Sequence, residues 1–132
     1  GDGKFDEITR LTREAVLTML GFNLQHVGIN TADEHEGVAL VKQLCALFDF
    51  PLKEGNTANF AGTAFEVIKG HGRGTKGHIA IQTNSIPRAM VYLERKGLEF
   101  DKGSAKEVNG VIQAVFFKDE IAGFAFHLLQ KK

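Results

Sequence analysis

The sequence predicts an α+β protein in which one extra helix precedes two β-α-β-β-β modules that together supply eight strands. HVGINT at residues 26–31 returns as HIAIQT at residues 78–83, and GTAFEVIK at residues 62–69 returns as GFAFHLLQ at residues 123–130. Self-similarity of this kind indicates an internal duplication, and the wider spacing of the second pair makes the second module longer by about nine residues. Because duplicated units tend to pair about a local twofold axis, as identical subunits do, we expect the two modules to meet at a common site.

Size and composition limit the classes of protein that need to be considered. A chain of 132 residues fits one domain that can bury a core without disulfides, and its 43% hydrophobic and 24% charged content is typical of a soluble globular protein. Lys plus Arg balances Asp plus Glu at 16 each, and no basic stripe alternates with aromatics, so nucleic acid is not an expected partner. No apolar run approaches the roughly 20 residues needed to cross a bilayer and no signal peptide opens the chain, so we expect no membrane partner and a cytoplasmic location.

The first element expected is a helix over residues 6–20. Asp6 can cap its start, and Gly21 provides a stop. Apolar residues recur at helical spacing, namely Ile8, Leu11, Ala15 and Met19. This helix lies outside the repeat, so we divide the chain into residues 1–22 and a domain over residues 23–132 with modules 23–70 and 77–132.

The first module begins with a strand over residues 24–31, in which apolar residues alternate with small or polar ones. Asp33 followed by Glu36 resembles a capping box, which starts a helix that ends near Asp49. Three short strands are expected to complete the module, at residues 50–53, 58–61 and 63–69.

A glycine-rich stretch at residues 70–77 separates the modules and has the composition of a solvated linker. It lacks the order of glycines followed by Lys and Ser or Thr that binds nucleotide phosphates. Its basic residues leave a second interpretation open, which is that they bind the anionic end of a substrate. These residues are His71, Arg73 and Lys76.

The second module repeats the order of the first. A strand at residues 78–83 is followed by Ser85 and Pro87, which suit the first turn of a helix that ends at Gly97. The remaining strands are expected at residues 98–100, 111–118 and 124–130.

Four ionisable residues occupy matching positions in the two copies. His26 and His78 lie in the first strands, and Glu66 and His127 lie in the last. Small residues such as Gly28 share a strand face with them and leave room for an ion or a substrate. We therefore predict a metal centre with these four ligands, whereas a duplication whose site has decayed would leave the same pattern as structure alone.

The HVGIN and HIAIQ strand openings and the terminal FEVI and FHLLQ strands resemble the vicinal oxygen chelate superfamily, which includes glyoxalase I, bleomycin-resistance proteins, methylmalonyl-CoA epimerase and extradiol dioxygenases. The resemblance covers residues 24–130 and implies that the paired βαβββ modules form a cupped, mixed eight-strand sheet. It also implies a divalent metal on residues matching His26, Glu66, His78 and His127, although the family commonly has Glu where this chain has His127. Some members hold no metal and sequester antibiotics, so a non-catalytic module that binds or senses a small molecule is the alternative.

The donor set implies a particular chemistry. Three neutral imidazoles and one carboxylate leave a divalent ion with a site charge of about plus one, and imidazole-rich ligation favours zinc, nickel, cobalt or ferrous iron. Such a site attracts an anionic substrate, for example a small oxo acid or hydroxy-carbonyl compound, for lyase or isomerase chemistry. Glu66 is the predicted proton-transferring base, being the carboxylate of the set. The sequence does not predict substrate-binding residues.

A second resemblance concerns the first helix. GKFDEITRLTREAV at residues 3–16 is similar to the final helix of bacterial 2-keto-3-deoxy-6-phosphogluconate/4-hydroxy-2-ketoglutarate aldolases. It implies that the chain is the C-terminal domain of such an aldolase, with an aldolase domain as its N-terminal partner. We also expect a homodimer, and the sequence leaves open whether the modules pair within one chain or are swapped between two.

Overall fold

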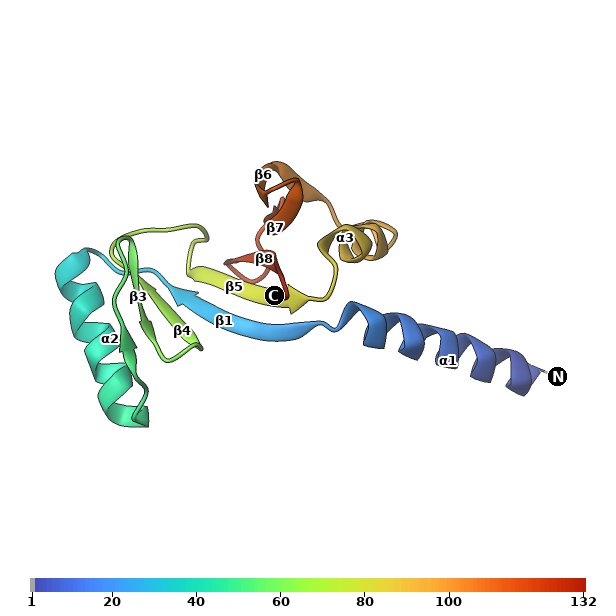
Figure 1. Ribbon diagram of the computed structural model, residues 1–132, viewed down its shortest axis with the longest axis horizontal. Coiled ribbons are helices and arrows are strands. Elements are labelled where there is room, and N and C mark those ends of the chain that lie inside the picture. The colour runs from blue at the N-terminus through green and yellow to red at the C-terminus, as the bar shows by residue number, and fades with distance from the viewer. Residues whose placement is uncertain (1) are drawn as a thin grey trace.

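In the computed structural model, which describes residues 2–132, the described chain forms three helices and one eight-stranded sheet (Figure 1). Gly1 and the side chains of Asp2 and Phe5 lie outside this description. The elements follow the predicted order of one helix and two βαβββ modules, which confirms the α+β fold class. In chain order they are α1 Asp2–Leu20, β1 Asn23–Ile29, α2 Glu34–Phe48, β2 Leu52–Lys53, β3 Ala58–Ala61, β4 Phe65–Ile68, β5 Gly77–Thr83, α3 Ile86–Glu94, β6 Phe100–Val108, β7 Val111–Phe117 and β8 Phe124–Gln130.

The sheet has the strand order β2-β3-β4-β1-β5-β8-β7-β6, so each module contributes four neighbouring strands. Within each module the first and last strands are parallel (β1 with β4, β5 with β8), and the other pairs are antiparallel. The antiparallel pairing of β1 with β5 joins the modules. The modules therefore meet within one chain.

The register at this junction shows the internal twofold relation. Val27 lies opposite Ile79, its own counterpart in the repeat, at the centre of the β1–β5 pair. The pairs on either side exchange under the same twofold, and they are His26 with Ala80 and Gly28 with His78. The duplication seen in the sequence is thus a symmetry of the folded chain.

Each module buries its helix on the same outer face of the sheet. In the first module α2 packs on β3 and β4 through a core of Val41, Ala61 and Val67. In the second module α3 packs on β7 and β8, and the core residues are Leu20, Ile86, Ala89, Phe100, Val115 and Leu128. With helices on one face, the opposite face is free to curve into a cup.

Side chains cap both module helices at the predicted places. Asp33 accepts a hydrogen bond from the backbone N–H of Glu36 at 2.8 Å and starts α2. The Glu36 carboxylate accepts from the N–H of Ala32, whereas a standard capping box would use the N–H of the capping residue itself. Ser85 accepts from the N–H of Arg88 at 3.4 Å and starts α3.

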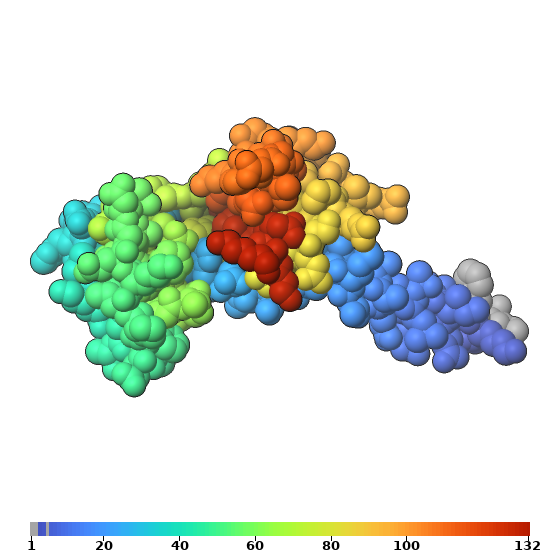
Figure 2. All heavy atoms as spheres, in the orientation of Figure 1, coloured from blue at the N-terminus to red at the C-terminus, as the bar shows by residue number. Residues whose placement is uncertain are grey.

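Helix α1 is docked at its C-terminal end and projects from the body elsewhere (Figures 1 and 2). Leu20 is only 1% exposed, and its carbonyl accepts hydrogen bonds from Thr83 Oγ1 at 2.6 Å and from Asn84 N–H at 2.8 Å. Ile8 and Leu11 are exposed by 64% and 50%. Among residues 2–132, no helix is both long and apolar enough to cross a membrane.

Two predicted element boundaries were wrong. Helix α1 already begins at Asp2, so Asp6 lies inside it and does not cap it. Strand β6 runs from Phe100 to Val108, well past the strand predicted at residues 98–100. Its register shifts after Asp101, and the Ser104 hydroxyl donates to the Asp101 carbonyl at 2.6 Å. This polar, irregular strand has no alternation for sequence reasoning to detect.

Candidate metal centre

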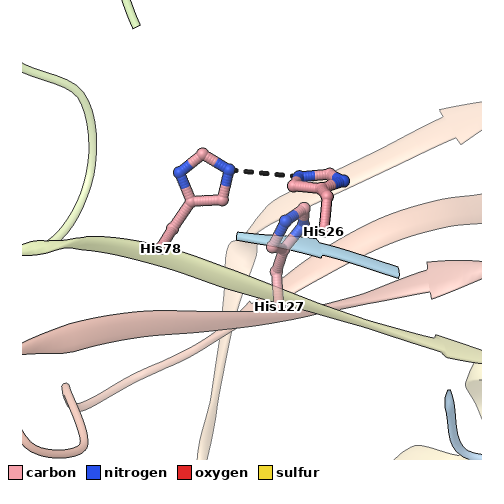
Figure 3. Close-up of side chains that lie close together, drawn as sticks. All are labelled: His26, His78 and His127. Carbon is pink, nitrogen blue, oxygen red and sulfur yellow. Dashed lines mark hydrogen bonds between the residues drawn. The ribbon is translucent and has the colours of Figure 1, made fainter. Parts of the chain in front are cut away.

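The four predicted ligands come from four neighbouring strands in the middle of the sheet. Glu66 lies on β4, His26 on β1, His78 on β5 and His127 on β8. Figure 3 shows the three imidazoles converging on a common point above these strands. The three imidazoles are buried, and the Glu66 side chain is 21% exposed. The structure therefore brings all four residues together.

Gly28 explains why the His78 ring lies where it does. Gly28 pairs with Glu66 on one side and with His78 on the other. A Cβ atom at position 28 would overlap the His78 ring, so this ring lies directly over the glycine backbone. The missing side chain lets the imidazole lean across β1 towards the carboxylate.

Ala80, the counterpart of Gly28 in the second module, also lies between two donors, one from each module. Ala80 pairs with His26 on β1 and with His127 on β8. The ring centroids of these two histidines are 5.7 Å apart. Each half of the site thus sets two donors, on neighbouring strands, on either side of a small residue.

Three donor atoms form a compact triangle. Glu66 Oε2 lies 2.9 Å from His26 Nε2 and 3.0 Å from His78 Nε2, and the two Nε2 atoms are 3.2 Å apart. Each imidazole Nε2 carries at most one proton, which points along only one edge of the triangle. Donor atoms about 3 Å apart have the mutual spacing of ligands around one transition metal bound at about 2.1 Å.

His127 completes the group from the other side. One ring nitrogen from each of the three histidines lies within 4.8 Å of the others. Both ring nitrogens of His127 are buried without a hydrogen-bond partner, and the ring stacks on Phe116 with centroids 4.6 Å apart. A buried polar atom left unpaired costs about 1–3 kcal/mol, which a bound ion would recover. The donor set and this unpaired nitrogen fit a divalent transition metal.

The electrostatics leave Glu66 and His127 in the states that a metal requires. Burial raises the pKa of Glu66, but hydrogen bonds from His26 and His78 and the charge of these two residues outweigh it and lower the pKa to about 2. Burial, followed by the charges of His78 and His26, lowers the pKa of His127 to about 3. At neutral pH the site therefore presents an ionised carboxylate and, at His127, a neutral imidazole.

Glu66, His78 and His127 line a cup with a volume of ≈ 880 Å³. Sequence reasoning offered binding of a substrate anion by Arg73 only as a second interpretation, and it missed Lys106 and Phe116, which also line the cup. Lys106 lies on irregular strand β6, so nothing in the sequence points it at the site. Other polar residues in the lining include Gln25, Gln82, Ser104 and Gln113.

Comparison with solved structures gives the same architecture. Hypothetical protein BH1468 from Bacillus halodurans C-125 superposes with a TM-score of 0.58 at 17% identity, covering 84% of this chain and 95% of that one. A Streptomyces coelicolor methylmalonyl-CoA epimerase in complex with 2-nitronate-propionyl-CoA gives 0.58 at 16% identity, with 83% and 94% covered. The methylmalonyl-CoA epimerase from Mycobacterium tuberculosis gives 0.58 at 15% identity, with 86% and 90% covered.

No family model and no curated protein matches the sequence. At identities of 15–17% the structural similarity establishes the fold and leaves the activity open. The chain has the cupped, eight-stranded glyoxalase-like fold that the family resemblance implied. The comparisons give no support to an attached aldolase domain, which stays a prediction.

Proposed function

We propose that the protein is a metal-dependent domain of the glyoxalase type, which acts on a small anionic oxo acid or hydroxy-carbonyl compound by proton transfer, as an isomerase or a lyase. The observation that supports it best is the donor group itself. His26, Glu66 and His78 place three donor atoms 2.9–3.2 Å apart, and His127 adds an unpaired buried nitrogen. Isolated structural histidines would be hydrogen-bonded to backbone or water instead.

The residues take distinct parts in this proposal. His26, Glu66, His78 and His127 would hold the ion, which when bound acts as a Lewis acid on a substrate carbonyl. The Glu66 carboxylate, which is the most exposed of the four, is the group that accepts and returns the proton. The stacked Phe116 shields one face of His127 from water.

Metal binding tests the proposal directly. We expect zinc, nickel, cobalt or ferrous iron to bind with a stoichiometry of one and to raise the unfolding temperature, because a ligand that binds only the folded state stabilises it. His127→Gln should abolish this effect. His35→Gln, which changes an exposed histidine at the start of α2, is the matched control and should leave it unchanged. Equal metal binding by the two variants would contradict the proposal.

A second candidate function is a binding module that senses or sequesters a small metabolite. The low pKa of Glu66 favours it, since a carboxylate that ionises at about 2 is a weak base towards a carbon acid. Glu66→Gln separates the two functions. If the protein is a catalyst, this variant loses turnover of oxo-acid or CoA-linked substrates. If it is a binding module, neither form turns a substrate over, and the variant changes only the affinity for the metabolite. CoA-linked acids belong in the assay because the epimerase structures hold a CoA-linked ligand.

An attached aldolase domain and a second copy of the chain would each pack on the same surface of the molecule. Both would cover the exposed apolar residues of α1, among them Ile8 and Leu11. Light scattering of the chain and of its Leu11→Glu variant tests the homodimer. A dimer that persists in the variant would place the contact elsewhere on the molecule.

A further inference from the structure

Arg73, in the linker between the modules, lies against the metal centre. Its guanidinium carbon is 4.2 Å from the centroid of the Phe116 ring, and that ring stacks on His127 at 4.6 Å. These two distances place the guanidinium within about 9 Å of the His127 ring, on a cation–π contact. Arg73 also lines the cup.

The linker around Arg73 is fixed on both sides. The Asn30 side chain accepts from the Gly72 N–H at 3.0 Å and donates to the Gly74 carbonyl at 2.8 Å, so one amide holds both neighbours of Arg73. One residue further, the Thr75 N–H donates to Glu120 at 2.8 Å. The stretch predicted to be a solvated linker does join the modules, but these bonds set the position of the arginine in advance of any ligand.

Positive charge gathers on the wall of the cup formed by the second module. Lys106 pairs in register with Ala114, which pairs with Leu129, two residues beyond His127 on the same strand face. Arg73 lies over Phe116 on β7, next to the same strands, so both cations lie on the side of the second module. Among the described residues that line the cup, Glu66 alone has a carboxylate side chain, and it lies on the opposite module.

Arg73 is free to take a new partner. Its present ion pair with Asp101 is 3.6 Å long, and both side chains are about half exposed, at 51% and 43%. An exposed pair of this kind contributes about 0–1 kcal/mol, so another anion can replace it. Stacking on Phe116 occupies the face of the guanidinium and leaves its N–H edges open for a bidentate carboxylate.

We propose that Arg73, together with Lys106, binds a second carboxylate of the substrate, so that the substrate class is an oxo acid with an anionic group at each end. This inference rests on the proposed function, in which the oxo-acid end meets the metal centre. A five-carbon diacid has carboxyl carbons about 5 Å apart, and a carboxylate–guanidinium contact adds about 4 Å between carbons. The sum reaches the upper limit of about 9 Å on the distance between the His127 ring and the Arg73 guanidinium.

The test compares two probes with the same oxo-acid end, pyruvate and 2-oxoglutarate, titrated calorimetrically into the metal-loaded protein. We expect 2-oxoglutarate to bind at least about tenfold more tightly, because hydrogen bonds between charged groups contribute that much. Arg73→Met should abolish the preference, and Asp101→Asn, which removes the competing carboxylate, should increase it. Arg13→Met, the same change on the projecting part of α1, is the matched control and should retain it.

Equal affinity for the two acids, or an unchanged preference in Arg73→Met, would overturn the inference. The same titrations on the metal-free protein, followed by NMR, separate it from the proposed function. A protein that binds no metal but still prefers 2-oxoglutarate through Arg73 would refute the proposed function and retain the second anion site. Failure of 2-oxoglutarate to bind in either form would refute the site.

Discussion

Replacing Gly28 by alanine tests the geometry of the centre with a single methyl group. The backbone of Gly28 does not have the positive φ that a side chain would strain. In an unobstructed strand the change to alanine therefore stabilises a protein, by about 0.4–1 kcal/mol. Here the new Cβ would overlap the His78 ring, so any loss of stability in Gly28→Ala comes from this one contact.

The size of the effect follows from what can move. Overpacking a close-packed site costs about 1–3 kcal/mol, and because the obstructing atoms are the end of a side chain that can rotate, we expect about 1 kcal/mol. The ring cannot rotate and also keep its Nε2 3.0 Å from Glu66 Oε2. Gly28→Ala should therefore lose one donor from the site, and we expect metal affinity to fall by at least about tenfold, the smallest loss typical of changes around metal ligands.

The measurements are metal affinity by calorimetry, the free energy of unfolding in urea, and the imidazole NMR signals of His78. Gly103→Ala on β6 is the matched control, because its Cβ would meet only Asp101 Oδ1, at an ordinary 3.5 Å. If Gly28→Ala binds metal as tightly as Gly103→Ala and leaves the His78 signals in place, the proposed arrangement of this ring is refuted.

Three further predictions concern acid stability and the docking of α1. Because the pKa of His127 falls from 6.5 to about 3 on folding, the unfolded chain takes up a proton first as the pH is lowered, and the stability that is complete above pH 6.5 should decline towards pH 3. His127→Gln should reduce the dependence on pH, in that range, of the free energy of unfolding measured in urea. The same dependence in the variant and the original protein would contradict burial as the cause. Because the pKa of Glu66 falls from 4.5 to about 2 on folding, its contribution to the free energy of unfolding is present above pH 4.5 and lost towards pH 2. Glu66→Gln should therefore lose less stability between pH 4.5 and pH 2. An unchanged loss would exclude the hydrogen bonds from the histidines as the cause of the low pKa. Measured on the monomer, Leu20→Ala should cost about 2–5 kcal/mol, whereas Leu11→Ala should change stability by less than about 0.5 kcal/mol. Similar losses in both variants would show that the projecting part of α1 packs against the body of the same chain.

The duplication made most of the fold and the grouping of the four donors predictable. Strand alternation assigned His26 and His78 to one face, and equivalence in the repeat assigned Glu66 and His127 to the same face. A twofold relation between two β-α-β-β-β units then leaves few ways to pair the strands. The observed pairing of Val27 with Ile79 satisfies that symmetry directly.

The parts that could not be predicted depend on contacts between distant segments. Lys106 reaches the cup because Ser104 replaces regular backbone pairing on β6, which an alternation pattern cannot reveal. Arg73 is positioned by Asn30, more than 40 residues earlier in the chain. The docking of Leu20 depends on the carbonyl contacts it makes at the end of β5, which its place in a helical stripe does not indicate.

The two modules have diverged, so the two walls of the cup carry different side chains. A perfect repeat would present identical donors from both modules, and a substrate could then bind in two equivalent orientations related by the twofold. Here Glu66 faces His127 across the axis, which places the carboxylate on one module and the imidazole stacked on Phe116 on the other. Arg73 adds positive charge to the second module only. Under the proposed function, an anionic substrate would be drawn to the wall formed by the second module, and Glu66 on the opposite wall would face its reacting carbon in a single orientation.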